Sequence, residues 1–98
     1  MEARINREGK HLSVKISDRL DAQTAPELDD TLFPQLEGIE SLSIDLSELV
    51  YISSAGLRVL LRCQKIMNEQ GEMKVSGVDG QVREIFEASG FDQILNVE

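Results

Sequence analysis

Apolar and polar residues alternate near the start of the chain, which is the pattern of a β-strand with one buried face. The clearest alternation runs from His11 to Ser17. A weaker strand is expected over Ala3–Arg7. Gly9 lies between the two segments and can adopt a positive φ without steric cost. Together these features predict an antiparallel hairpin at the N-terminus.

The spacing then changes to that of a helix, with one face made of Leu28, Leu32 and Leu36. We expect Thr24 to be the N-cap and Glu27 to complete a capping box with it. Pro34 lacks a backbone donor, so the helix is predicted to end near Phe33 or to bend there.

The second half alternates between strands and helices. The pattern predicts a strand at Leu42–Ser47, an apolar stretch at Leu49–Ile52, a helix from about Ala55 to Gln70, a strand at Met73–Val78, a helix between Asp79 and Gly90, and a short strand at Gln93–Val97.

The resulting order, β-β-α-β-α-β-α, predicts an α/β fold in one domain that spans residues 1–98. After the hairpin, strands and helices alternate, so the later strands should run parallel through right-handed crossovers. Strands buried on both faces would be apolar throughout, whereas the second and third strands alternate. We therefore expect a mixed sheet with helices mainly on one face.

Charge and cysteine content narrow the class of protein. The formal net charge of −8 disfavours binding to nucleic acids and to anionic membranes. Cys63 is the only cysteine, so an intrachain disulfide is excluded. The first ten residues lack the apolar run of a signal peptide, and no segment has the length of a membrane-spanning helix. We expect a cytoplasmic protein.

The candidate site is Ser53-Ser54-Ala55-Gly56, which joins a predicted strand to the long helix. One interpretation is structural: the serines cap the helix and Gly56 allows close packing. The other is functional, because a helix N-terminus stabilises a phosphate group by roughly 0.3–2 kcal/mol. A phosphoserine there would then be compatible with the fold.

The chain resembles the STAS domain, in particular the bacterial anti-sigma-factor antagonists, over nearly its whole length. The resemblance is strongest in the segment from Asp45 to Leu61, and a second match is Arg19-Leu20-Asp21-Ala22-Gln23-Thr24-Ala25. The family loop often reads Asp-Ser-Ser/Thr-Gly, with phosphorylation of the residue after the Asp. Aligned on Gly56, that residue is Ser54, with Ser53 in place of the Asp and as the second choice for modification.

The resemblance implies regulation of transcription by partner switching. The unphosphorylated form would bind an anti-sigma factor, a serine kinase with a GHKL-type ATP site, and release the sigma factor. Phosphorylation of Ser54 would end this binding, and a PP2C-type phosphatase would restore it. The expected partner-binding residues are Asp21, Ser53, Ser54, Ala55, Gly56, Leu57, Arg58 and Leu61. The alternative is a STAS scaffold without a switch, such as a subunit of a lipid transporter or a stress-signalling assembly.

Several of these residues have a second interpretation. Leu57 and Leu61 fit either the core or an apolar contact surface. Arg58 fits either plain exposure to solvent or a contact at the rim of an interface, and Asp21 fits either local hydrogen bonding or a partner contact.

Catalysis is not expected. The junction only partly matches the Gly-x-Ser-x-Gly motif of α/β-hydrolases, because Ile52 replaces the first glycine. A serine nucleophile also needs a base, and the only histidine, His11, lies in the hairpin. One cysteine and one histidine give no metal-binding pattern, so neither a metal nor a cofactor is expected.

Overall fold

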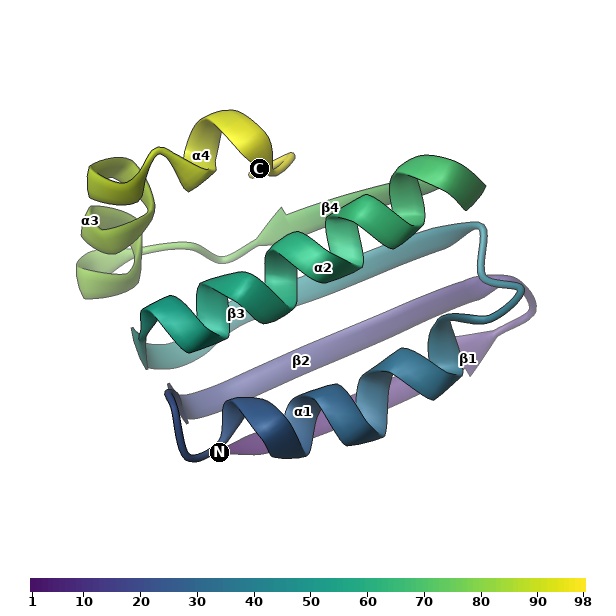
Figure 1. Cartoon of the computed structure of the whole chain (residues 1–98), viewed down its shortest axis with the longest axis horizontal. Coiled ribbons are helices and arrows are strands. Elements are labelled where there is room, and N and C mark those ends of the chain that lie inside the picture. Colours follow the sequence, from purple (N-terminus) through teal and green to yellow (C-terminus); the bar gives the residue numbers. More distant parts are fainter.

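The computed structural model describes all 98 residues, which form a four-stranded sheet with helices packed on it (Figure 1). The strands are β1 (Glu2–Glu8), β2 (His11–Leu20), β3 (Ser41–Ile52) and β4 (Glu72–Ser76), and they lie side by side in that order. β1 and β2 are antiparallel, whereas β3 runs parallel to both β2 and β4. The predicted α/β class, the hairpin and the parallel later strands are confirmed.

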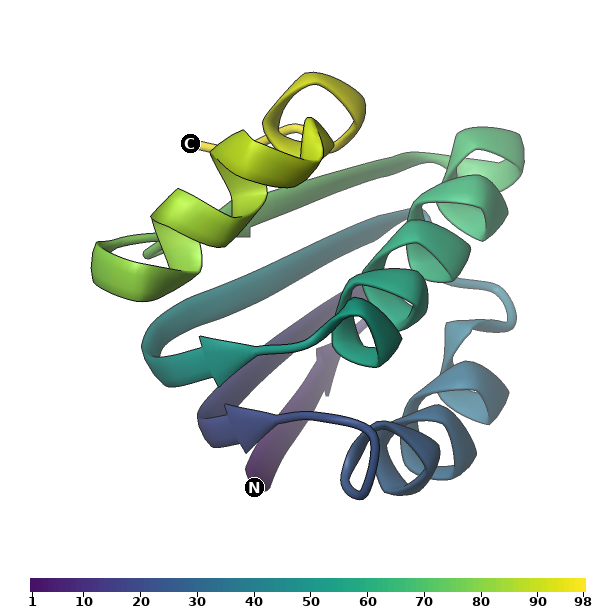
Figure 2. The ribbon, with the colours of Figure 1, turned by 60° about the vertical axis from the view of Figure 1, so that its left-hand side comes forward.

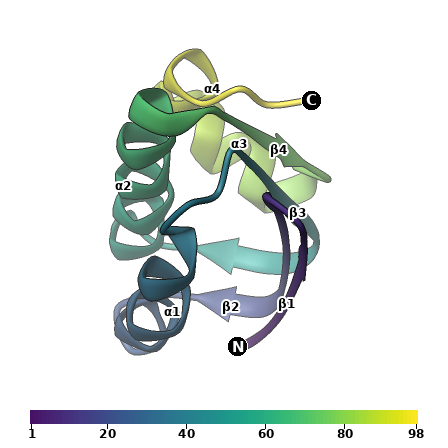
Figure 3. The same cartoon turned by 90° about the vertical axis from the view of Figure 1, so that its right-hand side faces the viewer.

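The helices are α1 (Ala25–Leu32), α2 (Ser54–Gln70), α3 (Gly80–Ser89) and α4 (Phe91–Ile94), with a 3₁₀ turn, η1 (Phe33–Leu36), after α1. α1 and α2 lie next to each other on one face of the sheet, and α3 and α4 lie towards the β4 side (Figures 2 and 3). The expectation of helices mainly on one face is confirmed. Pro34 ends α1 as predicted, because the chain tightens into η1 there.

A single apolar core lies between the sheet and the helices. β2 contributes Leu12, Val14 and Ile16, and β3 contributes Leu42, Ile44 and Leu46. The opposing residues are Leu28, Leu32 and Leu36 from α1 and η1, and Val59, Leu60, Cys63 and Met67 from α2. Burial of one such side chain contributes roughly 1.5–3 kcal/mol, so the core fixes the position of α2, which carries the candidate site.

β3 contains two irregularities near its C-terminal end. Lys15 pairs with Asp45, but Ser17 pairs with Glu48 and Arg19 pairs with Tyr51. At each of these two places β3 contains one more residue than the paired segment of β2. At the first, Oδ1 of Asp45 accepts a hydrogen bond from the N–H of Ser47 (2.8 Å). These bulges interrupt the alternation and join the two apolar segments of the sequence into one strand.

Thr24 is the N-cap residue of α1, as predicted, but the predicted capping box with Glu27 is wrong. Thr24 already has helical backbone angles (φ −96°, ψ −23°), and its side chain makes no capping bond to α1. Instead its hydroxyl oxygen accepts a hydrogen bond from the N–H of Asp21 (2.9 Å), and Oδ1 of Asp21 accepts one from the N–H of Thr24 (3.1 Å). Asp21 therefore begins a turn three residues earlier, and its carboxylate stabilises this turn before α1.

The strand predicted at Gln93–Val97 is also wrong. Gly90 has a left-handed conformation (φ +77°), as expected of a helix stop, but the chain then forms the short helix α4. Only Val97 pairs with the sheet, through one isolated bridge to Val75. Leu95 is buried and partly buried Phe91 packs on the core, so apolar packing holds this segment together with two backbone hydrogen bonds to Val75.

Candidate functional site

The candidate site lies where two neighbouring parallel strands end. Leu20, the last residue of β2, is paired with Ile52, the last residue of β3. The N–H of Ser53 donates a 2.9 Å hydrogen bond to the carbonyl oxygen of Leu20. The loop that begins with Asp21 and the start of α2 therefore leave the same end of the sheet.

The two serines of the junction have different roles. Ser53 has an extended backbone (φ −97°, ψ 175°) and is the N-cap of α2, and its Oγ accepts a hydrogen bond from the N–H of Gly56 (3.4 Å). Ser54 is the first residue of α2, is exposed, and makes no side-chain hydrogen bond within the chain. The cap thus occupies the hydroxyl of Ser53 and leaves that of Ser54 accessible.

Gly56 is required by close packing. A Cβ at this position would lie 2.8 Å from both Cγ1 of Ile52 and Cγ of Leu20, and 2.9 Å from the carbonyl oxygen of Leu20. Only glycine lets the first turn of α2 approach the ends of β2 and β3 so closely. Gly56 is buried, so its part in the site is to allow this close packing, and a contact with a partner stays a prediction.

Asp21 combines a structural role with an accessible carboxylate. Its Oδ1 accepts hydrogen bonds from the N–H groups of Gln23 (3.0 Å) and Thr24 (3.1 Å), and its Oδ2 lies 3.7 Å from Nε of Arg19. The hydrogen bond from Thr24 is the main reason that the pKa of Asp21 is lowered from its ordinary value. The predicted local hydrogen bonding is confirmed, and a contact with a partner stays a prediction.

The structure divides the predicted contact residues of α2 into two groups. Leu57 is only 5% exposed and belongs to the core, although it also lines the hollow beside Ser54; its contact with a partner stays a prediction. Ala55 and Leu61 are half-buried, and Arg58 is exposed. Arg58 makes no hydrogen bond or ion pair with other residues of the chain. The surface at the start of α2 is therefore formed by Ser54, Ala55, Arg58 and Leu61.

Two hollows flank this surface. One lies between α1 and α2 and is lined by Ala22, Ala25, Pro26, Asp29, Ala55, Arg58, Val59 and Arg62. The other lies on the opposite side of Ser54 and is lined partly by Ile85, Ala88 and Ser89 of α3. The contribution of α3 could not be predicted, because nothing in the helical pattern of that segment relates it to Ser54.

Val50 is a second residue near the site that sequence reasoning missed. It lies in the second bulge of β3, and its side chain is 57% exposed. The adjacent Tyr51 carries the guanidinium of Arg19 over its ring, 4.5 Å from the centroid. The apolar run from Leu49 to Ile52 does not indicate which of its residues is exposed, and only the bulge reveals that position.

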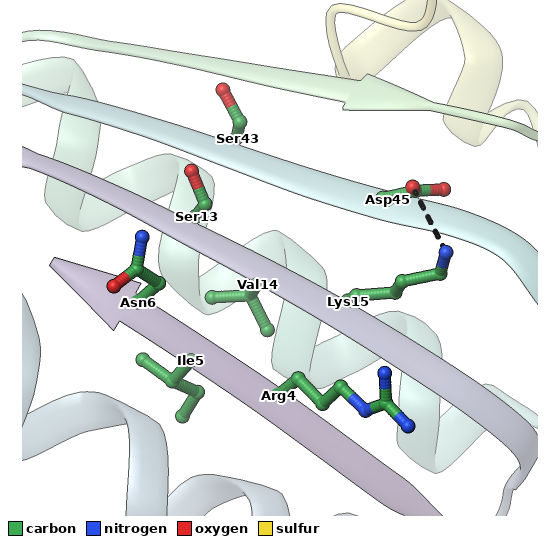
Figure 4. Close-up of a pocket in the computed structure, with 8 residues that line it drawn as sticks. All are labelled: Arg4, Ile5, Asn6, Ser13, Val14, Lys15, Ser43 and Asp45. Atoms are coloured by element: carbon green, nitrogen blue, oxygen red, sulfur yellow. Dashed lines mark ion pairs between the residues drawn. The ribbon is translucent and has the colours of Figure 1, made fainter.

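The face of the sheet away from α1 and α2 carries a polar hollow (Figure 4). Its cations are already paired: Lys15 lies 4.0 Å from Asp45 and 3.6 Å from Glu48, and Arg4 lies 3.1 Å from Glu2.

His11 is too far from Ser54 to act as its base. It begins β2, where its ring contacts the hydroxyls of Ser41 and Ser13, whereas Ser54 follows the opposite end of the sheet. Nine residue steps of β2 separate the two ends, which corresponds to roughly 30 Å. The structure also contains no cluster of three or more His, Cys, Asp or Glu residues that could hold a metal ion. None of its helices has the length and apolarity needed to cross a membrane.

The fold is a mixed sheet that positions an exposed serine at a strand-to-helix junction. The family model described as "Mlab, STAS domain" matches residues 3–96, and the chain belongs to the STAS domain family.

The similar proteins include anti-sigma factor antagonists. A candidate anti-sigma factor antagonist of Bordetella bronchiseptica, BtrV, is 39% identical over 82 residues, which cover 83% of this chain and 65% of that protein. The anti-sigma-B factor antagonist of Staphylococcus aureus is 29% identical over 90 residues, which cover 90% and 83%. The solved structure of an anti-sigma factor antagonist from Mycobacterium paratuberculosis superposes with a TM-score of 0.88 at 21% identity, covering 98% and 83% of the two chains. This last likeness supports the fold.

Proposed function

We propose that this STAS domain is an anti-sigma-factor antagonist that binds its partner through the end of the sheet around Ser54 and is switched off by phosphorylation of Ser54. The observation that carries the proposal is that the two serines have different roles. Ser53 caps α2, so its oxygen is engaged, whereas Ser54 is exposed and its hydroxyl is accessible to a kinase.

A phosphate on Ser54 would be compatible with the fold. It would lie at the N-terminus of a 17-residue helix, where free N–H groups favour negative charge by roughly 0.3–2 kcal/mol. The first turn of α2 contains no acidic residue that would oppose it. Phosphorylation should therefore change the surface without unfolding the domain.

The charge of this phosphate is sufficient to weaken binding strongly. It adds about −1.5 to −2 charges at neutral pH. Two unit charges about 6 Å apart, at an effective dielectric constant near 20, interact by about 3 kcal/mol. An acidic group of the partner at that distance would thus reduce the affinity more than a hundredfold. The names of the relatives point to an anti-sigma factor as the partner. The family resemblance implies that this partner is also a serine kinase of the GHKL type and that a PP2C-type phosphatase reverses the modification in the cytoplasm.

The experiment is phosphorylation by the kinase that co-purifies with the chain from its native host. Wild type, Ser54→Ala and Ser53→Ala are incubated with this kinase and ATP, and the intact mass and the modified peptide are measured. We expect addition of one phosphate to wild type and Ser53→Ala and none to Ser54→Ala. Unmodified wild type would contradict the switch, and modification lost only in Ser53→Ala would move it to Ser53.

A STAS scaffold without a switch is the second candidate, because Ser53 stands where the family pattern often has an acid. Such a module would bind its partner equally well with Ser54 or with Glu at this position. The comparison of these two forms in a binding titration separates the candidates, since the switch requires Ser54→Glu to weaken binding.

A further inference from the structure

Arg58 is exceptional among the cations of this acidic protein. Five of the ten lysines and arginines form ion pairs with side chains: Arg4, Lys10, Lys15, Arg19 and Lys74. Two others donate to backbone carbonyls, Arg7 to Gly9 and Arg83 to Val78, and Arg62 lies over the ring of Phe33 at 4.0 Å. Only Arg58 and Lys65 have no such partner, although acidic residues outnumber basic ones by 18 to 10.

The position of Arg58 relates it to Ser54. The two residues are four apart in α2, so they lie one turn from each other on the same side of the helix. Both are exposed. An anion that precedes a cation by four residues has the favourable orientation for pairing along a helix.

Two other charged residues line the same hollow as Arg58: Asp29, which is an anion, and Arg62, which lies over the ring of Phe33. The hollow on the α3 side of Ser54 is lined by the uncharged Ile85, Ala88 and Ser89. Asp21 is engaged by two backbone N–H groups, and Arg19 lies between its carboxylate and the ring of Tyr51. Arg58 is therefore the cation available to a phosphate on Ser54.

We infer that Arg58 is the anion receptor of the switch: it pairs with the phosphate of phosphorylated Ser54 and is thereby withdrawn from the binding surface. In the unphosphorylated domain Arg58 is free to contact an acidic side chain of the partner. Phosphorylation then acts twice, because it adds negative charge and neutralises the one free cation of the surface. This inference deepens the proposed function and rests on it.

The pairing is tested without any partner, so its failure is distinguishable from failure of the proposed function. Phosphoserine is installed at position 54 during translation with a suppressor tRNA, and ³¹P NMR follows the second ionisation of the phosphate in the full chain. In wild type the guanidinium should lower this pKa. Arg58→Gln should raise it by on the order of 0.3 units, and Arg58→Lys should restore much of the difference.

Lys65→Gln is the matched control, because it removes the other unpaired cation at a site eleven residues further along α2, or roughly 16 Å. It should leave the phosphate pKa at the wild-type value. Equal pKa values in wild type and Arg58→Gln, or an equal shift in Lys65→Gln, would overturn the pairing. Circular dichroism of each variant shows whether the helix is intact, and Arg58→Lys provides a second comparison if Arg58→Gln is unfolded.

Measurement of partner affinity tests independently whether phosphorylation withdraws Arg58 from the binding surface. With the co-purifying partner, we expect Arg58→Gln to weaken binding of the unphosphorylated domain about tenfold, and phosphorylation to weaken binding less in this variant than in wild type. Independent, multiplicative effects of the two changes would show that phosphate does not act through Arg58.

Discussion

Ser53 donates its backbone N–H to the carbonyl oxygen of Leu20 over 2.9 Å, and this bond joins the ends of two parallel strands. Immediately beyond it, β2 leads into the loop of Asp21 and β3 leads into α2. The exposed hydroxyl of Ser54 is therefore held on a rigid junction rather than on a free loop. A partner that binds here would meet the hydroxyl in a fixed orientation, as the proposed switch requires.

The close approach of α2 to this junction predicts the effect of Gly56→Ala. The added methyl would lie 2.8 Å from side-chain carbons of Leu20 and Ile52, and 2.9 Å from a backbone oxygen that cannot move freely. We expect a loss of about 1–3 kcal/mol in the free energy of unfolding, measured by urea denaturation. The control Ser54→Ala alters an exposed position in the same turn and should change stability by less than about 0.5 kcal/mol. Equal stability of Gly56→Ala and wild type would show that the junction relaxes.

The sequence predicted most of the fold because its signals were local. Alternation identified β2 and the first half of β3, and leucines four apart identified α1. Alternation failed at Val50, where a bulge moves one residue of an apolar run into solvent. It also failed after Gly90, because a short helix and a short strand have the same apolar content over a few residues.

The candidate site was predicted in position but not in detail. The Ser-Ser-Ala-Gly loop marked the junction, but its sequence could not decide which serine caps α2. That depends on the backbone angles of Ser53, which follow from its bond to Leu20. The burial of Leu57 and the hollow beside α3 depend on contacts between distant segments, for which one sequence has no signal.

The different roles of the two serines predict different effects of alanine substitution. Ser53→Ala removes the oxygen that accepts the N–H of Gly56, so we expect a loss of about 0.5–1 kcal/mol in the free energy of unfolding. Ser54→Ala should cost less than about 0.5 kcal/mol, since its hydroxyl has no partner in the chain. Urea denaturation of both variants measures the difference. A larger loss for Ser54→Ala would mean that Ser54 is the structural cap.

Cys63 is predicted to resist alkylation in the folded protein. Burial is the main cause that raises the pKa of its thiol to about 12, and the negative charge of Asp29 adds to it. Almost no thiolate is present at pH 8, and the sulfur is inaccessible, so iodoacetamide should react only after unfolding. Mass spectrometry of native and urea-treated samples measures the modification. Val50→Cys in a Cys63→Ala background is the control, because this exposed position should react in the native state, and rapid native labelling of Cys63 would contradict its burial.

Asp21 is predicted to make stability depend on acid pH. Hydrogen bonds from the N–H groups of Thr24 and Gln23 stabilise its carboxylate, so its pKa in the folded state lies below the ordinary value of 3.8. The Asp21 carboxylate binds its proton more tightly in the unfolded chain than in the folded one. The free energy of unfolding therefore rises as the pH increases from the lowered pKa of the folded state to the ordinary pKa of the unfolded state. The contribution is complete above about pH 4 and is lost as the pH falls through the lowered pKa of the folded state.

Asp21→Asn tests this dependence, because an amide oxygen can still accept both hydrogen bonds but carries no charge. We expect Asp21→Asn to be less stable than wild type at pH 7, with the difference narrowing as the pH falls below 4, when both are followed by thermal unfolding. Asp30→Asn is the control, since it removes an exposed carboxylate that has no hydrogen bond or ion pair in the chain. A stability difference between wild type and Asp21→Asn that is the same at pH 7 and at pH 3 would show that the charge of Asp21 does not stabilise the turn before α1.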